Sequence, residues 1–290
     1  MQRLIYILLY PIIWLLSIMP FWVLHIKSRV LFFLAYYVIG YRRKVVKANI
    51  ALALPDRSDV EQLKIAKEFY KHLCDLVFES IKVLTISEKA LNKRFRYTNP
   101  ELVEQYKEKG QSMLILCGHY ANWEWSGILG RYTDFKAYGV YKRLDNPYFD
   151  RLVKKLRGRF GAEVVSNKKI VPTLFRAKQR GEFCASLILS DQTPKPGNFK
   201  HRDTFMDIDV PMFTGTEDLA KKLDMAPVFL KIEKTGRSRY QATMVPLTEN
   251  ATALPDYQLT RLFYDQLEAQ IRKDAPYYLW SHKRWKHRKA

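Results

Sequence analysis

The chain has 290 residues, of which 48% are hydrophobic and 14% aromatic, and its 49 lysines and arginines against 29 acidic residues give a net charge of +20. This apolar content excludes a largely disordered chain, and the excess of cations indicates anionic partners such as lipid headgroups, an acidic protein or nucleic acid. Three widely spaced cysteines (Cys74, Cys117 and Cys184) argue against a disulfide framework or a zinc site and favour free thiols.

The first predicted element is an apolar stretch near the N-terminus. Leu4–Leu24 contains 21 residues without a charge, which predicts a transmembrane helix, although a buried helix of a soluble core is an alternative. Pro11 and Pro20 could each kink this helix, which a helix in a bilayer tolerates. Basic residues gather after it, from Lys27 to Lys47, so the positive-inside rule places the body in the cytoplasm. The next apolar run, Val30–Tyr41, is too short to span and is either interfacial or part of the core. We therefore expect residues 1–45 to form a membrane anchor and interfacial segment.

The body, residues 46–290, alternates between helical and strand patterns. Helices are expected at 59–84, 122–130, 147–160, 170–180, 214–223 and 256–273, and strands at 112–117, 136–141, 162–166, 183–189, 227–232 and 240–246. Asn146 before Pro147 and a capping box of Thr214 and Glu217 mark two of the helix starts. This alternation predicts an α/β domain with one mixed, mostly parallel sheet flanked by helices. Residues 192–210 form the longest expected loop.

Polar side chains follow three of the expected strands. They are His119 and Glu124 in the sequence GHYANWE, then Arg143 and Asn146, and then Asp191 and Gln192. Ligands bind beyond the carboxyl ends of the strands in open α/β sheets, so these groups are expected to share one edge and one site.

The chemistry of these groups suits proton transfer. An imidazole such as that of His119 can take a proton from an alcohol near neutral pH, and Glu124 could orient the ring. Arg143 could bind a phosphate or stabilise an oxyanion. The same residues also fit ordinary roles: a structural histidine at a strand end, a turn residue at Asp191 and a surface charge at Arg143.

Four blocks of the sequence, GHYANWEW, YKRLDNPYF, LSDQTP and WSHKRWKHR, are similar to motifs of one family, and KANIALALPD is similar to a basic, Asn-containing stretch of the same family that ends in Pro. They resemble the G-H-x-x-N-W-E, Y-R-x-x-x-N-P, D-Q and W-x-H-R-R-W/F blocks of lipid A biosynthesis (lauroyl/myristoyl) acyltransferases. The resemblance covers nearly the whole chain, with two departures: Lys142 precedes Arg143, and the loop after Asp191 is richer in cations. Glycerol-phosphate acyltransferases instead use H-x4-D with an F-P-E-G-T block, which this sequence lacks.

The resemblance implies an enzyme that transfers a fatty acyl chain from acyl carrier protein to a hydroxyacyl group of a lipid A precursor. His119 would be the general base with Glu124 as its partner. Substrate binding would fall to Asn122, Trp123, Arg143, Asn146, Asp191 and Gln192, and the membrane interface to Trp280, Arg284 and Trp285.

The same resemblance implies an acyl carrier protein partner and a membrane lipid substrate. No nucleic acid, metal or bound cofactor is expected, because the sequence shows no nucleic-acid-binding module, no histidine pair with metal-ligand spacing and no G-x-S-x-G, Walker or G-x-G-x-x-G motif. The location would be a bacterial inner membrane, with one membrane-spanning helix and the catalytic body on the cytoplasmic side. A glycerophospholipid or aminolipid acceptor, a hydrolase that uses the same histidine, and a non-enzymatic basic membrane-associated protein are the alternatives.

Overall fold

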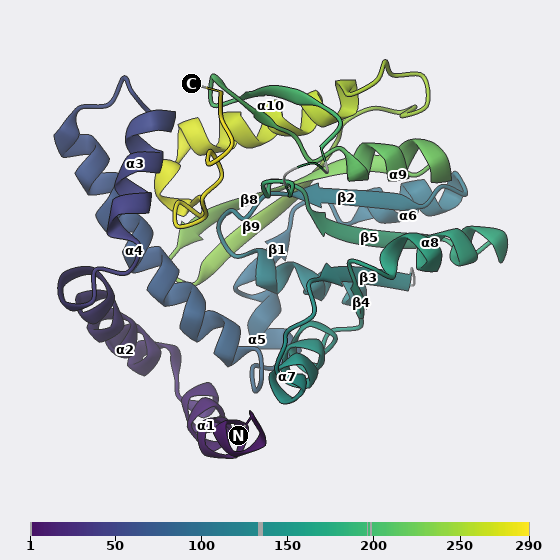
Figure 1. The fold of residues 1–290 in the computed structure, drawn as a ribbon. Helices are drawn as coiled ribbons and strands as arrows, with labels where there is room; N and C mark the ends of the chain where they lie inside the picture. The colour runs from purple at the N-terminus through teal and green to yellow at the C-terminus, as the bar shows by residue number, and fades with distance from the viewer. Residues whose placement is uncertain (1, 133–135, 196, 198, 290) are drawn as a thin grey trace.

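The computed structural model describes residues 2–132, 136–195, 197 and 199–289, and its centre is a seven-stranded sheet (Figure 1). In sheet order the strands are β1 (Phe95–Tyr97), β9 (Arg239–Pro246), β8 (Ala226–Gly236), β2 (Met113–Cys117), β5 (Cys184–Leu189), β3 (Lys136–Tyr141) and β4 (Glu163–Ser166). Neighbouring strands run parallel except β8 and β9, which form an antiparallel hairpin. The predicted mixed, mostly parallel sheet is confirmed.

Helices flank this sheet on both sides (Figure 1). Those of the body are α3 (Arg43–Ala53), α4 (Asp59–Lys82), α5 (Glu88–Asn92), α6 (Glu101–Glu108), η2 (Trp123–Arg131), α7 (Pro147–Arg157), α8 (Ile170–Gln179), α9 (Gly215–Leu223), α10 (Gln258–Lys273) and η3 (Ala275–Tyr277). Asn146 caps α7 as predicted, because its Oδ1 accepts the backbone N–H of Tyr148 at 3.0 Å.

Two local predictions are wrong. The expected loop at 192–210 contains a small antiparallel hairpin of β6 (Arg202–Phe205) and β7 (Ile208–Pro211). The expected capping box of α9 does not form, because the Glu217 carboxylate reaches a distant segment instead. It accepts hydrogen bonds from the backbone N–H groups of Tyr257 at 2.7 Å and Thr260 at 2.9 Å.

The apolar N-terminal stretch forms two helices where one was predicted. α1 (Gln2–Ile18) ends before Pro20, and α2 (Phe21–Phe33) begins after it, because proline has no backbone N–H to continue the first helix. The ammonium of Lys82 donates to the carbonyls of Ser17 and Met19, both at 2.7 Å, and so fixes this break to α4.

A short π-helix, η1 (Leu34–Val38), extends α2. Within the described residues, one helical stretch, Phe21–Val38, is long and apolar enough to cross a membrane by length and composition. It overlaps the predicted span only at Phe21–Leu24.

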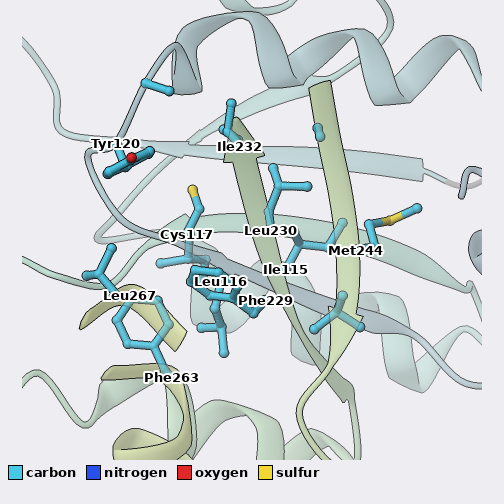
Figure 2. Packing of buried hydrophobic residues seen from close by; sticks show 14 of the residues in the cluster. Ile115, Leu116, Cys117, Tyr120, Phe229, Leu230, Ile232, Met244, Phe263 and Leu267 are labelled. Carbon is cyan, nitrogen blue, oxygen red and sulfur yellow. The ribbon is translucent and has the colours of Figure 1, made fainter. Parts of the chain in front are cut away.

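The core between the sheet and α10 is densely packed (Figure 2). Phe263 and Leu267 of α10 lie against Leu116 of β2 and Phe229 of β8, and the rings of Phe229 and Phe263 are 5.9 Å apart. Gly118 follows β2 at this contact, where a Cβ atom would come within 2.6 Å of the Leu267 side chain. Glycine therefore lets α10 approach the start of the next loop closely.

Candidate active site

Three loops with the expected polar residues meet at one edge of the sheet. β2 lies between β5 and β8, and β5 pairs with β3, all in parallel. The register places Cys117 opposite Leu189, so His119 and Asp191 leave neighbouring strands two residues beyond this pair. Arg143 leaves β3 on the same side, with an exposed side chain. The predicted convergence of the three loops on one edge is therefore confirmed.

The C-terminal segment fixes the backbone of the His119 loop. The N–H of Leu279 donates to the carbonyl of His119 at 3.0 Å, and the N–H of Ala121 donates to the carbonyl of Tyr277 at 3.0 Å. Ala121 has φ 51°, a left-handed conformation that is uncommon for a residue with a side chain. The loop is thus held in a strained turn by chain that lies more than 150 residues away in sequence.

Asp191 is the carboxylate bound to His119. Its Oδ1 lies 2.6 Å from Nδ1 of the ring, and its Oδ2 accepts the backbone N–H of His119 at 2.9 Å. Burial alone would raise the pKa of Asp191, but the charge of the imidazole and these hydrogen bonds outweigh it and hold the pKa below its ordinary value. The carboxylate therefore stays ionised and fixes the ring through Nδ1.

Gln192 and Trp123 lie next to the rest of the imidazole. Nε2 of the ring lies 3.1 Å from Nε2 of Gln192, whose side chain is exposed. Trp123 packs edge-on against the ring, with centroids 5.1 Å apart. The His119 side chain as a whole is largely buried, at 8% exposure. With Nδ1 donating to Asp191, Nε2 carries the lone pair of the ring and accepts the amide of Gln192.

Glu124 does not hold the ring, and the expected contact with His119 is replaced by an ion pair. Both carboxylate oxygens of Glu124 accept hydrogen bonds from Arg157 of α7, one of them at 2.8 Å from Nε. Burial lowers the pKa of Arg157, but Glu124 more than compensates and the pKa is raised overall. The physical reason is local geometry: Glu124 lies in the first turn of η2, which points it toward α7.

Two other predicted site residues have structural contacts. The side chain of Asn122 is buried: its amide donates to Glu79 at 2.6 Å, and its oxygen caps η2 by accepting the N–H of Trp125 at 3.1 Å. Asn146 uses its oxygen to cap α7. Substrate binding by these two residues stays a prediction, as it does for Trp123, Arg143 and Gln192.

The predicted membrane-interface residues are core residues, which corrects that assignment. Trp280, Arg284 and Trp285 are exposed by 0%, 0% and 1%. The indole N–H groups donate to the carbonyls of Ala275 at 2.7 Å and Phe205 at 3.1 Å. The segment folds back over the body, as the yellow chain near α3 shows in Figure 1.

Arg284 connects this segment to the end of β5. Its guanidinium donates to the hydroxyl of Tyr264 at 3.1 Å, and that hydroxyl donates to the carbonyl of Ser190 at 3.3 Å, next to Asp191. The C-terminal block therefore supports both the His119 loop and the Asp191 loop.

Sequence reasoning missed two neighbours of the site. The amide of Asn49 on α3 donates to the carbonyls of Trp280 and His282, both at 2.8 Å. The His282 ring lies near the pair: burial lowers its pKa, His119 acts in the same direction, and Asp191 opposes both. Each residue lies in a block that resembles the family, His282 in the W-x-H block and Asn49 in KANIALALPD, but neither block indicates a contact so distant in sequence.

The known proteins and the family model that this chain matches all belong to one family. A sequence model described as bacterial lipid A biosynthesis acyltransferase matches residues 1–287. The chain is similar to the lipid A biosynthesis lauroyltransferase of Escherichia coli (strain K12), with 23% identity over 287 residues, 96% of this chain and 90% of the relative. It is also similar to a lipid A biosynthesis acyltransferase of Haemophilus influenzae, with 21% identity over 148 residues, 50% of this chain and 46% of that relative.

Proposed function

Because the chain belongs to the bacterial lipid A biosynthesis acyltransferase family and is therefore an acyltransferase, we propose that it transfers a fatty acyl chain from acyl carrier protein to a hydroxyacyl group of a lipid A precursor. The observation that carries the proposal is the pairing of His119 with Asp191 at the carboxyl edge of the sheet, with Nδ1 and Oδ1 2.6 Å apart.

His119 is the general base of the proposed reaction. Its Nε2 removes the proton from the acceptor hydroxyl while the hydroxyl oxygen attacks the thioester carbonyl of the donor. The tetrahedral intermediate then collapses, the carbon–sulfur bond breaks, and the proton passes from His119 to the leaving thiolate. The transfer is direct and uses no bound cofactor.

Asp191 has the orienting role that the sequence assigned to Glu124. A carboxylate on Nδ1 fixes the tautomer with its lone pair on Nε2 and stabilises the imidazolium that forms. Gln192 occupies the place of the acceptor hydroxyl near Nε2, and its exposed side chain can swing away when a lipid binds. Arg143 remains the proposed ligand for substrate charge on the neighbouring loop.

The N-terminal helices form the proposed membrane contact. Many of their large apolar side chains face outward, among them Leu8, Ile12, Trp22, Val30 and Phe33. Monomeric proteins rarely expose apolar surface of this extent to water. Cations follow directly, in Arg42, Arg43, Lys44 and Lys47, and suit an anionic leaflet. We propose attachment to the cytoplasmic side of a bacterial inner membrane through residues 1–45.

The first test is acyl transfer by the purified enzyme in detergent, with acyl-acyl carrier protein as donor and a lipid A precursor as acceptor. His119→Ala should lower kcat by about 10²- to 10⁴-fold, the usual contribution of a general base. His201→Ala, which removes an imidazole stacked on Tyr257, is the matched control. A folded His119→Ala protein with full activity would refute the mechanism.

The second test identifies the acceptor in cells. Mass spectrometry of membrane lipids with and without the protein should show a lipid A species that is one acyl chain heavier only when the protein is present. A glycerophospholipid or aminolipid that gains the chain instead would change the acceptor while leaving the chemistry intact.

A further inference from the structure

A polar cavity lies beside the His119 loop. Its volume is about 700 Å³, and its walls come from α2, α4, the turn between β8 and β9, and Tyr277. The charged groups that line it are Arg29, Lys71, Lys234 and Arg237 against Glu68 and Asp75. Cations therefore outnumber carboxylates in this cavity, which we call the Lys234 cavity.

Most of these charges are paired with one another. Arg237 binds both carboxylate oxygens of Asp75, with the shortest distance 2.7 Å, and Lys71 binds Glu68 at 2.7 Å. Among the residues that the structure describes, neither Lys234 nor Arg29 takes part in an ion pair. The unpaired charge of the cavity is thus positive and belongs to these two residues.

Lys234 is held in place by neutral groups. Its ammonium lies 3.3 Å from Nδ1 of His72 and 5.1 Å from the centre of the Tyr277 ring. His72 is itself buried, and its Nε2 lies 3.3 Å from the carbonyl of Ala121. Burial lowers the pKa of Lys234, and Glu79 and Asp75 oppose this only in part. A desolvated ammonium without a bonded anion is costly, and an anionic ligand would remove that cost.

The cavity lies between the His119 loop and the proposed membrane face. Lys234 lies on β8 beyond the residues paired with β2, on the same edge of the sheet as His119. His72 contacts the carbonyl of Ala121, within the His119 loop. On its other side the cavity is lined by Arg29 and Phe32 of α2, next to the exposed apolar Val30 and Phe33.

We propose that the Lys234 cavity binds a phosphate group of a substrate, with Lys234 and Arg29 as its cationic ligands. The inference rests on the proposed function, because it deepens the account of how substrates reach His119. Two substrates of that reaction can carry the phosphate: the acceptor lipid, and the phosphate-containing arm that joins the acyl chain to its carrier protein. Charge-assisted hydrogen bonds to phosphate provide the recognition in either case.

The kinetic test compares Lys234→Met with Lys222→Met, which removes an exposed cation on α9. Lys234→Met should raise KM for the phosphate-bearing substrate by about 10- to 100-fold, the usual worth of one charge-assisted hydrogen bond. kcat should change little, and Lys234→Arg should recover part of the affinity. Lys222→Met should leave both constants unchanged.

Varying each substrate in turn shows whether the bound phosphate belongs to the acceptor lipid or to the donor. If the phosphate belongs to the acceptor, the KM effect appears with a phosphorylated acceptor and disappears with the same lipid after enzymatic dephosphorylation. If it belongs to the donor arm, KM for acyl-acyl carrier protein rises and KM for the acceptor does not. An unchanged KM for both substrates overturns the proposal while the function of His119 stands.

A thermal-shift measurement tests phosphate binding to the cavity without catalysis. It can be interpreted even if Lys234→Met lowers the stability of the protein, because each protein is compared with itself in chloride. Inorganic phosphate should raise the Tm of the wild-type protein and of Lys222→Met above the value in chloride at equal ionic strength, by preferential binding to the folded state. The increase should be lost in Lys234→Met, whatever its starting Tm. A wild-type Tm that does not respond to phosphate, or an equal response in Lys234→Met, overturns the proposal even if acyl transfer is confirmed.

Discussion

The carboxylate of Asp191 holds His119 through both its ring and its backbone N–H. Asp191→Asn keeps the size of the side chain but presents an amide to Nδ1, which disfavours the tautomer needed at Nε2. We expect kcat for acyl transfer to fall by about 10²- to 10⁴-fold, as when the orienting acid of a catalytic triad is neutralised. Steady-state kinetics with saturating donor measures this fall.

Glu124→Gln is the companion variant. Glu124 binds Arg157 at a partly exposed site, so its loss should cost about 1 kcal/mol or less in unfolding free energy and less than tenfold in kcat. If Glu124→Gln abolished transfer while Asp191→Asn retained it, the roles of the two carboxylates would have to be exchanged.

The buried imidazole of His72 predicts a pH dependence of stability. Burial, together with the charge of Lys234, holds its pKa well below the ordinary 6.5. The unfolded chain therefore takes up this proton first as the pH falls. The contribution of neutral His72 is fully present above pH 6.5 and is lost on acidification, by up to about 1.4 kcal/mol per pH unit.

Chemical unfolding of the purified protein between pH 7.5 and 5 measures this slope. His72→Gln should flatten it, whereas Tyr277→Phe, which keeps the edge-on ring contact with His72, should retain it. Equal slopes in wild type and His72→Gln would show that another group sets the dependence.

At the scale of elements, α1 and α2 present an apolar surface that the body leaves uncovered. Tyr6 of α1 stacks on Tyr148 of α7 at 5.6 Å and so turns that side of the helix toward the body. Leu8 and Ile12, one turn apart, are exposed by 63% and 55%. The geometry suits a helix that rests its outer face on lipid.

The variant Leu8→Glu/Ile12→Glu tests this contact. Each apolar side chain is worth about 1.5–3 kcal/mol when buried, so partition onto anionic vesicles should fall at least tenfold. Val171→Glu/Phe175→Glu makes the same change on α8, where the two side chains are exposed by 56% and 52%. Flotation of both proteins with phosphatidylglycerol-containing vesicles gives the comparison, and equal flotation would assign the membrane contact to another surface.

At the scale of the whole molecule, the C-terminal segment joins elements that are distant in sequence. The amide of Asn49 on α3 donates to two backbone carbonyls of this segment. The backbone groups of Tyr277 and Leu279 in the same segment form hydrogen bonds with the His119 loop. The first and last quarters of the chain therefore meet at the reaction site, and their contacts should contribute to stability and activity together.

Asn49→Ala should lower the unfolding free energy by about 1–3 kcal/mol, because two carbonyls lose their donor, one of them in a buried bond. The same variant should lower kcat more than it raises KM, since it loosens the support of the loop. Gln105→Ala, at an exposed position of α6, should change unfolding free energy by less than about 0.5 kcal/mol. Chemical unfolding of both variants checks the first expectation, and normal stability of Asn49→Ala would contradict it.

The alternation of elements, the sheet class, the edge at which the polar loops meet and the family could all be predicted from the sequence. These features depend on hydrophobic periodicity, on cap residues such as Asn146, and on short motifs, all of which act between near neighbours in the chain. β3 begins and ends at the residues expected from its pattern. The sequence also indicated the apolar N-terminal region and a kink at Pro20, where the structure ends one helix and begins the next.

Which carboxylate reaches His119 depends on the three-dimensional fold. Asp191 is 72 residues away in sequence, and the two meet because β2 and β5 pair with Cys117 opposite Leu189. The five-residue spacing to Glu124 suggested the wrong contact, since η2 turns that side chain toward Arg157. Likewise, tryptophans beside cations are typical of a membrane interface, yet the fold buries Trp280 and Trp285. Register and long-range docking set these contacts, and neither leaves a periodic signal in the sequence.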